Sequence, residues 1–193
     1  MPSRPVSEGV VVGPGGVPRC PWGVSTPDYV AYHDDEWGRP VRSDNGLFER
    51  LTLEAFQSGL SWLTILRKRE GFRRAFAGFD IAAVAAFDSA DRARLLADAE
   101  IVRNRAKIDA TIANAKAAAA LIAPLTDLIW GFAPSRSAAP VTTADVPAQT
   151  DESRALARAL KAHGFVFVGP VTAYALMQAV GLVNDHLRDC AFR

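Results

Sequence analysis

The two ends of this 193-residue chain each carry one cysteine and one histidine, and this distribution constrains the fold more than any other feature. Cys20 and His33 lie near the start, His186 and Cys190 lie near the end, and the sequence contains two cysteines and three histidines in all. Thiolates and imidazoles are the usual zinc ligands, and four of them close a tetrahedral structural site. On a helix, the spacing of His186 and Cys190 would place both side chains on one face. The pattern predicts a zinc site that ties the N-terminal segment to a C-terminal helix and adds its binding energy to folding.

The same residues have simpler interpretations, which the spacing leaves open. The two cysteines can form a disulfide or remain buried free thiols, and a lone histidine is usually an ordinary surface or core residue. Two cysteines in a chain of this size argue against a disulfide-built secreted domain. Residues 1–12 lack the extended apolar core of a signal peptide, and no uninterrupted apolar run reaches membrane-spanning length. We therefore expect a cytoplasmic protein with no membrane partner.

Helix signals follow one another along the chain, and no stretch sustains the period-two alternation of a strand. The fold class is therefore predicted to be all-α, without internal repeats. Residues 1–18, rich in glycine and proline, are predicted to be a flexible tail, and residues 131–150, with three prolines, a loop. The predicted helices begin at Pro27, cover 44–58 with Asp44 as the cap, begin at Ser61, at Asp80 and at Asp88 or Ser89, and cover 103–121, 151–163 and 170–181.

A short glycine-bounded segment, residues 164–169, separates the last two predicted helices. Gly164 can end the first helix in the left-handed conformation, and Pro170 is favoured at the first position of the second. The free backbone N–H groups at that helix start form an anion site. This is the layout of the helix-hairpin-helix element, which holds a DNA phosphate through backbone amides. The alternative is an ordinary helical hairpin whose aromatic and valine side chains pack in the core.

Charge alone does not indicate a nucleic-acid binder, because the net charge is only +1. Two basic clusters, within residues 67–74 and 103–107, stand out against this balance. Each cluster can be a solvated helix face or a surface that holds phosphates.

Glu54 lies on the apolar side of the predicted helix 44–58. Leu47, Leu51 and Glu54 fall at i, i+4 and i+7, so the carboxylate points where the helix should be apolar. A buried carboxylate needs hydrogen-bond donors, or its pKa rises, and such residues cluster at functional sites. The alternatives are a rotated stripe with Glu54 half-exposed, or a pair with an arginine.

Aromatic residues flank Glu54 in the sequence. Tyr29, Tyr32 and Trp37 come from the segment before it, and Trp62 follows shortly after. The faces of tyrosine and tryptophan bind planar rings, cationic rings above all. The four tryptophans of the chain can equally serve as core packing.

A series of motifs in this chain resembles the type I 3-methyladenine DNA glycosylases. The matching segments recur in order over about residues 19–190. They include Cys20-Pro-Trp-Gly, Tyr29-Val-Ala-Tyr-His-Asp-Asp-Glu-Trp-Gly38, Leu53-Glu54, Gln57-Ser-Gly-Leu-Ser-Trp62, Arg103-Asn-Arg-Ala-Lys-Ile108, Gly164-Phe-Val-Phe-Val-Gly-Pro170 and Gly181-Leu-Val-Asn-Asp-His186.

The resemblance implies one helix-hairpin-helix glycosylase domain over residues 19–193, with terminal segments clipped by one structural zinc per chain. Its ligands would be Cys20, His33, His186 and Cys190, and Asp185 is expected to orient this shell. The implied activity flips 3-methyladenine out of alkylated double-stranded DNA and hydrolyses its N-glycosidic bond, leaving an abasic site. No lysine lies in the pocket motifs, so no lyase activity is expected, and a monomer is the default expectation.

The resemblance also implies roles for single residues. Glu54 would contact the lesion base, and in its ionised form it would favour a cationic base over neutral adenine. Tyr32 would share the polar contacts to the base, Trp62 would stack on it, and Tyr29 and Trp37 would line the pocket. Leu60 would fill the gap that the base leaves in the duplex. The residues implied to bind DNA are Gly59, Gly164, Val168 and Gly169. Two positions depart from the family pattern: Phe56 predicts a more apolar pocket wall, and Glu100 weakens the expectation that residues 103–107 hold phosphates.

Overall fold

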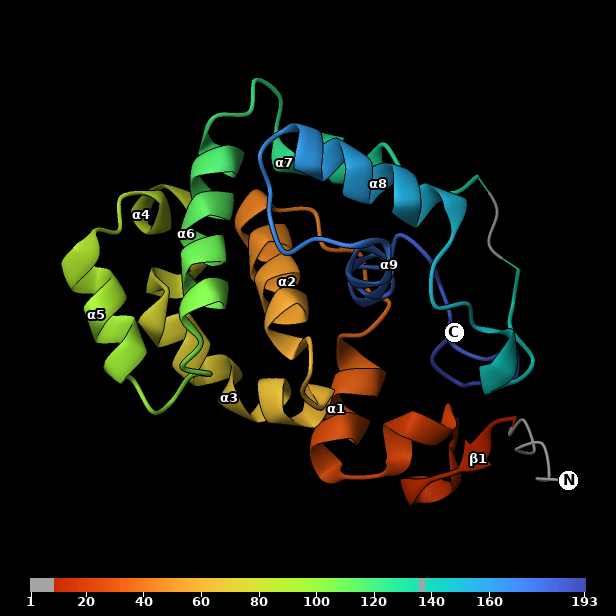
Figure 1. Cartoon of the computed structure of the whole chain (residues 1–193). Coiled ribbons are helices and arrows are strands. Elements are labelled where there is room, and N and C mark those ends of the chain that lie inside the picture. Colours follow the sequence, from red (N-terminus) through yellow and green to blue (C-terminus); the bar gives the residue numbers. More distant parts are fainter. Residues whose placement is uncertain (1–8, 136–137) are drawn as a thin grey trace, which may run out of the picture.

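The structure, a computed structural model, describes residues 9–135 and 138–193 and is mostly helical (Figure 1). The helices are α1 (Pro27–Asp35), α2 (Asp44–Gln57), α3 (Trp62–Ala75), α4 (Ile81–Ala85), α5 (Ser89–Ala97), α6 (Arg105–Ala119), α7 (Leu125–Trp130), α8 (Asp151–Ala162) and α9 (Pro170–Ala179). Short 3-10 turns cover Pro14–Gly16, Pro21–Val24, Ala77–Phe79 and Thr143–Asp145. None of the helices in the described ranges is long and apolar enough to cross a membrane.

Local capping explains most helix starts. The side chains of Ser61, Asp80 and Asp88 accept hydrogen bonds from backbone N–H groups at the starts of α3, α4 and α5, as the sequence predicted. The predicted cap of α2 is wrong, because Ser43 fills that position. The Asp44 carboxylate instead accepts bonds from Leu125 N–H (3.1 Å) and Thr126 N–H (2.8 Å) and so caps α7, a helix that the sequence did not predict.

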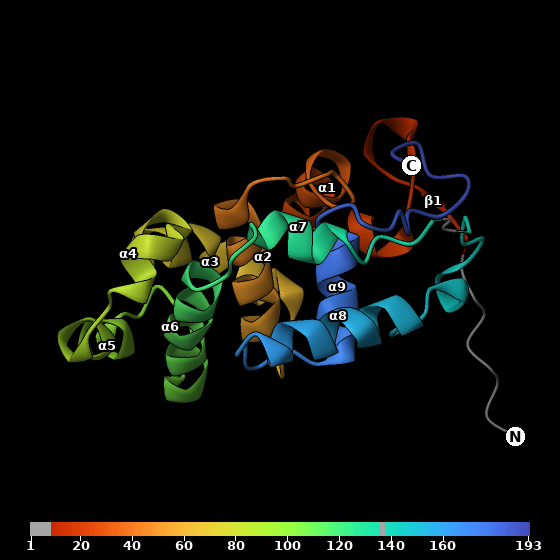
Figure 2. The same ribbon diagram turned by 90° about the horizontal axis from the view of Figure 1, so that it is seen from above.

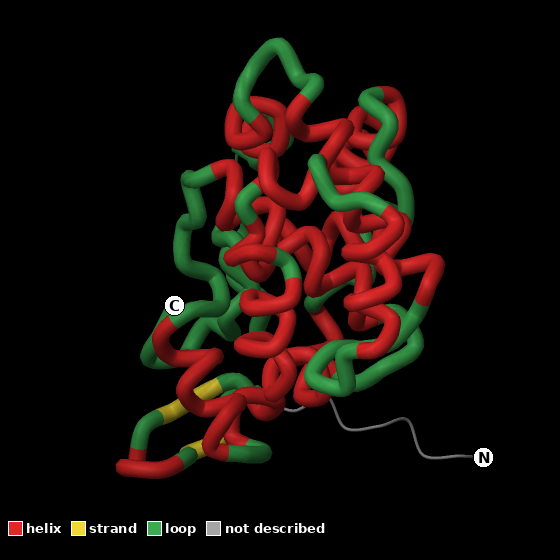
Figure 3. Tube along the Cα trace, turned by 90° about the vertical axis from the view of Figure 1, so that its left-hand side faces the viewer, coloured by secondary structure: helices red, strands yellow, loops and turns green. Residues whose placement is uncertain are grey.

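The N-terminal segment, predicted to be a flexible tail over residues 1–18, contains a short β-ribbon. Residues 1–8 lie outside the described residues, but β1 (Val11–Val12) pairs antiparallel with β2 (Pro18–Arg19). The C-terminal segment joins this ribbon, since the Ala191 N–H donates to the Pro18 carbonyl oxygen at 3.0 Å. Figure 3 shows the two strands in yellow close to the C-terminal end of the chain.

Helix α2 runs through the centre of the molecule, with α6 on one side and α9 on the other (Figure 1). Its buried side chains include Leu47, Phe48 and Leu51. Phe56 packs against Phe72 with ring centroids 4.7 Å apart, inside the core and not at the pocket. The prediction of a more apolar pocket wall at Phe56 is therefore wrong.

Seen from above, α4 and α5 form one end of the molecule, and β1 lies with the C-terminus at the other (Figure 2). The last helix, α9, ends at Ala179, and the residues after it form turns. His186 and Cys190 therefore do not lie on a helix, contrary to the prediction from their spacing. They approach each other because the chain folds back on itself in this segment.

Candidate active site

A cavity of ≈ 590 Å³ opens between α1, α2, α3, α9 and the C-terminal segment. It brings together all five side chains that the sequence singled out for the base-binding site, namely Tyr29, Tyr32, Trp37, Glu54 and Trp62. Further lining residues that the sequence analysis did not assign to this cavity include Trp22, Gln57, Gln178 and Asp185.

Glu54 is the buried acid of this cavity, with 7% of its surface exposed. Among the described residues no side chain or backbone group donates a hydrogen bond to its carboxylate. Burial raises the pKa of Glu54 to about 8, and the positive charge of Arg50 offsets this only in part. Arg50 is itself held by Glu36, whose Oε2 accepts from its Nη2 at 2.9 Å. At neutral pH the free protein therefore holds Glu54 mainly in its protonated form.

Aromatic rings form the walls around this acid. The rings of Tyr32 and Trp62 lie with centroids 5.4 Å apart and planes tilted by 46°. On the other side, Trp22 meets Trp37 edge to face at 4.9 Å and Tyr29 at 5.8 Å. Edge-to-face contacts of this kind fix ring orientation as well as burying area. Trp22 thus connects the rings of α1 with Trp37, and its place in the motif directly after Cys20-Pro was the signal that could have indicated it.

Asp185 is a second acidic residue that lines the cavity. Its Oδ2 accepts hydrogen bonds from the Tyr174 hydroxyl at 2.6 Å and from Gln178 Nε2 at 2.8 Å. It makes no hydrogen bond to either histidine of the Cys/His cluster, so the expectation that it orients this cluster is wrong. Burial, followed by the bond to Asp185, raises the pKa of Tyr174.

The Cys/His cluster lies directly behind the aromatic wall. Cys20, His33, His186 and Cys190 are all buried, and their ligand atoms lie within 4.8 Å of one another. Cys190 Sγ is 3.6 Å from both His33 Nε2 and His186 Nδ1, and the two nitrogens are 3.2 Å apart. With metal bonds of about 2.3 Å to sulfur and 2.0–2.1 Å to nitrogen, the ligand atoms of a tetrahedral site lie roughly 3.3–3.8 Å from one another. The four residues are thus spaced to hold one metal ion, and both cysteines are free thiols.

The remaining polar atoms of this cluster are oriented by neighbours. Asp34 Oδ1 lies 2.8 Å from His33 Nδ1, and the Trp37 carbonyl oxygen lies 3.1 Å from His186 Nε2. Such partners fix the histidine tautomer that presents the opposite nitrogen to a metal. Burial lowers the pKa of His186 to about 4, which keeps this imidazole in the neutral form that ligates metals. Asp34 has the orienting role that the sequence analysis gave to Asp185.

Two segments that the resemblance assigned to DNA contact lie outside this cavity. Leu60, with 40% of its surface exposed, lies in the turn between α2 and α3, next to Gly59 at a φ of +79°. The second segment, residues 164–169, begins with Gly164 at a φ of +88° and ends with Gly169 at the N-cap of α9. Val168 is buried, with 2% of the surface of the whole residue exposed.

The first basic cluster is largely neutralised by ion pairs. Arg67 binds Asp28, Arg69 binds Glu36, and Arg74 binds Glu100. Arg73 likewise pairs with Glu49 and Glu70. In the second cluster, Lys107 is buried while Arg103 and Arg105 are exposed. Among the described residues, the ion pairs thus leave few free cations in the first cluster, which favours a solvated helix surface for residues 67–74.

Comparison with known proteins decides the family. Residues 22–193 match the methyladenine glycosylase family. The chain belongs to this family. DNA-3-methyladenine glycosylase 1 of Escherichia coli (strain K12) is 46% identical over 178 residues, which cover 89% of this chain and 95% of that protein. DNA-3-methyladenine glycosylase of Haemophilus influenzae (strain ATCC 51907 / DSM 11121 / KW20 / Rd) is 43% identical over 180 residues, covering 89% and 96%.

Solved structures of methyladenine glycosylases share the fold. A crystal structure of 3-methyladenine DNA glycosylase I superposes with a TM-score of 0.86 at 43% identity and covers 90% of this chain and 98% of that one. The Staphylococcus aureus 3-methyladenine DNA glycosylase I, described for its recognition of 3-methyladenine, gives a TM-score of 0.85 at 33% identity, covering 90% and 95%. The family resemblance inferred from the motifs is thus confirmed.

Proposed function

We infer that this chain is a DNA-3-methyladenine glycosylase, a hydrolase that releases 3-methyladenine from alkylated DNA and leaves an abasic site. The observation that carries this inference is Glu54, a buried acid without a hydrogen-bond donor, in a cavity walled by tyrosine and tryptophan rings. Burying such a group costs folding free energy, and a ligand that supplies donors or positive charge recovers it.

The lesion has the chemistry that fits this cavity. Methylation at N3 gives the adenine nucleoside a positive charge, so its glycosidic bond is already weak and the base leaves without prior protonation. A cationic ring beside Glu54 lowers the pKa of the carboxyl group, and the acid then loses its proton to solvent and becomes the counter-charge of the base. Trp62 and Tyr32 offer ring faces to the purine, and a cation over such faces gains further stabilisation.

Exposure of the base requires the nucleotide to leave the stack, which costs a few kcal/mol. We propose that Leu60 enters the vacated space and that Gly59 gives the turn the left-handed conformation it needs. The segment between α8 and α9 is proposed to be a helix-hairpin-helix element, with Gly164, Val168 and Gly169 supplying backbone contacts to a phosphate.

Water is the proposed nucleophile, because the described residues that line the cavity include no lysine to form a Schiff base. Lys107, the one buried lysine described, directs its amine to backbone carbonyl oxygens instead. As the bond breaks, its electron pair moves to the base, which becomes neutral, and the positive charge passes to the sugar. The negative charge of Glu54 stabilises this developing cation. The enzyme is therefore monofunctional, without lyase activity.

The Cys/His cluster is proposed to hold one zinc ion. Two thiolates and two imidazoles fill a tetrahedral shell and leave no position for a reactive water, so the metal would stabilise the fold and take no part in the reaction. Because Cys20 also lines the cavity, the cluster would hold the aromatic wall in place. We further propose a cytoplasmic monomer, since one chain provides all five side chains proposed to bind the base and two cysteines in a chain of this size argue against a disulfide-built secreted domain.

The experiment that tests the activity is incubation of the purified protein with methylated duplex DNA, followed by chromatography of the released bases. Released 3-methyladenine supports the proposal. Binding to methylated DNA without any released base would instead indicate a lesion-binding protein, and the proposed activity would be rejected.

A further inference from the structure

Helix α6 carries a stripe of buried polar side chains. Lys107, Thr111 and Asn114 lie at i, i+4 and i+7, with 8%, 3% and 2% of their surfaces exposed. A buried amine or amide is costly unless it is hydrogen-bonded, so its partners show what it does. The Thr111 hydroxyl donates to the Lys107 carbonyl oxygen of its own helix at 2.9 Å. The other two side chains reach out of α6 to two different segments.

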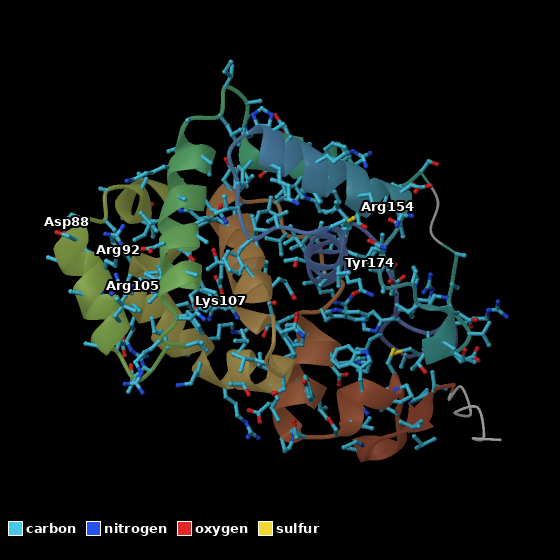
Figure 4. The ribbon with its side chains drawn as sticks, viewed as in Figure 1. Asp88, Arg92, Arg105, Lys107, Arg154 and Tyr174 are labelled. Carbon is cyan, nitrogen blue, oxygen red and sulfur yellow. The ribbon has the colours of Figure 1, made fainter. Side chains whose placement is uncertain are left out.

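Lys107 holds the turn that carries Leu60. Its Nζ donates to the carbonyl oxygens of Phe56 at 2.8 Å and Ser58 at 2.6 Å. These carbonyls lie at the C-terminal end of α2, where the helix leaves backbone acceptors without partners and favours a positive charge. Figure 4 shows Lys107 between α6 and α2. The lysine thus fixes where residues 58–61 leave the helix.

Asn114 holds the other segment. Its Nδ2 donates to the Val166 carbonyl oxygen at 3.1 Å, and its Oδ1 accepts from the Val166 N–H at 2.7 Å. One amide therefore satisfies both backbone groups of Val166, as a neighbouring strand would. The side chains of Val166 and Phe167 remain 43% and 45% exposed at the tip of this segment.

We propose that Lys107 and Asn114 are positioning residues that set the separation between the two DNA-facing segments, 58–61 and 164–169. This inference rests on the proposed function. Seven residues of an α-helix span about 10.5 Å and are rigid, so α6 acts as a fixed spacer between the two attachment points. Leu60, which is proposed to fill the gap in the duplex, and residues 164–169, which are proposed to bind a phosphate, must contact the same duplex at the same time. A misplacement of about 1 Å in either segment can lower the rate by roughly 100-fold.

The test compares Lys107→Met and Asn114→Leu with Thr111→Val, which removes a polar atom of the same stripe but contacts neither segment. Three quantities are measured: base release from methylated duplex DNA, base release from methylated single strands, and affinity for free 3-methyladenine. We expect kcat/KM on duplex to fall at least about 10-fold for the first two variants, with a clearly smaller loss on single strands. Affinity for the free base should stay within about twofold, and Thr111→Val should resemble the wild type in all three.

Equal losses on duplex, single strands and free base would mean general damage to the fold and would overturn the inference, as would full activity of both variants on duplex. Asn114→Ala, a smaller change, replaces Asn114→Leu if that variant shows no cooperative thermal transition, and Lys107→Arg, which keeps the donors, should recover most of the duplex activity. A wild-type protein that releases no base from either substrate would reject the proposed function, a result distinct from the failure of the variants.

Discussion

Glu54 and the Cys/His cluster are two buried polar sites on either side of the aromatic wall, and they differ in whether the protein itself supplies their polar partners. In the Cys/His cluster, the outer nitrogens of His33 and His186 each face an oxygen atom. Glu54 has no such partner among the described residues, and burial raises its pKa to about 8. A polar group that the protein satisfies by itself holds the fold together. A polar group left without donors is poised to gain free energy from a ligand.

The largest effect should come from the unsatisfied group. Glu54→Gln keeps the shape but removes the charge that faces the cationic base. We expect base release from methylated duplex to fall by about 100-fold or more, or ~3 kcal/mol of transition-state stabilisation. The release rate in single-turnover experiments measures this. Glu100→Gln, at an exposed carboxylate paired with Arg74, is the matched control and should keep the wild-type rate. An unchanged rate in Glu54→Gln would remove this acid from the mechanism.

Changes to the Cys/His cluster should mainly lower the stability of the fold and affect the rate of base release less. Cys190→Ala or extraction of the metal by a chelator should lower the free energy of unfolding by about 3 kcal/mol or more. Denaturant unfolding and elemental analysis check this together, with one zinc per wild-type chain and none in the variant expected. Cys190 does not line the cavity. A wild-type protein without zinc would favour plain free thiols at this site.

The aromatic wall lies between the two groups and should give a smaller effect. Trp62→Ala should weaken the binding of free 3-methyladenine by about 1–3 kcal/mol if the indole stacks on the base. Isothermal titration with the free base measures the loss. Trp130, which packs against Arg42 away from the cavity, provides the control variant Trp130→Phe, for which we expect no change in base affinity. Equal affinities for the wild type and Trp62→Ala would exclude stacking.

The pH dependence tests the protonation state of Glu54 without changing any residue. If only ionised Glu54 receives the cationic lesion, kcat/KM should fall about 10-fold for each pH unit below the pKa of about 8 in the free protein. Above that pKa it should reach a plateau. Glu54→Gln should have a flat profile over this range. A wild-type profile that is flat from pH 6 to pH 9 would contradict the raised pKa.

Stability should move with pH in the opposite sense. The folded state holds the Glu54 proton up to about pH 8, whereas the ordinary pKa of a glutamate is 4.5, so the folded state binds more protons between these values. The free energy of unfolding therefore decreases as pH rises through this window. The difference in unfolding free energy between Glu54→Gln and the wild type should grow with pH over the same range.

Local sequence signals predicted several helix starts, the buried position of Glu54 and the four residues of the Cys/His cluster. Caps at Ser61, Asp80 and Asp88 act within a few residues, so the helix starts could be predicted from the sequence alone. The apolar period of α2 placed Glu54 on the buried side, and that position needs no knowledge of distant segments. The four Cys/His residues could be listed because their chemistry is distinctive, and the motif series indicated the family.

Only the tertiary structure decided the partners of these residues. Asp44 caps α7, 81 residues away, and not the helix that it begins. Asp34 orients the metal cluster in place of Asp185, and Lys107 and Asn114 each bind a backbone segment more than 45 residues distant. The chemistry of a side chain determines which kinds of group it can bind, whereas long-range packing determines which group lies within hydrogen-bond distance. The same reason explains why His186 and Cys190 lie close together without a helix. Two residues four apart can approach each other in a helix or in a turn, and the tertiary contacts determine which of the two forms.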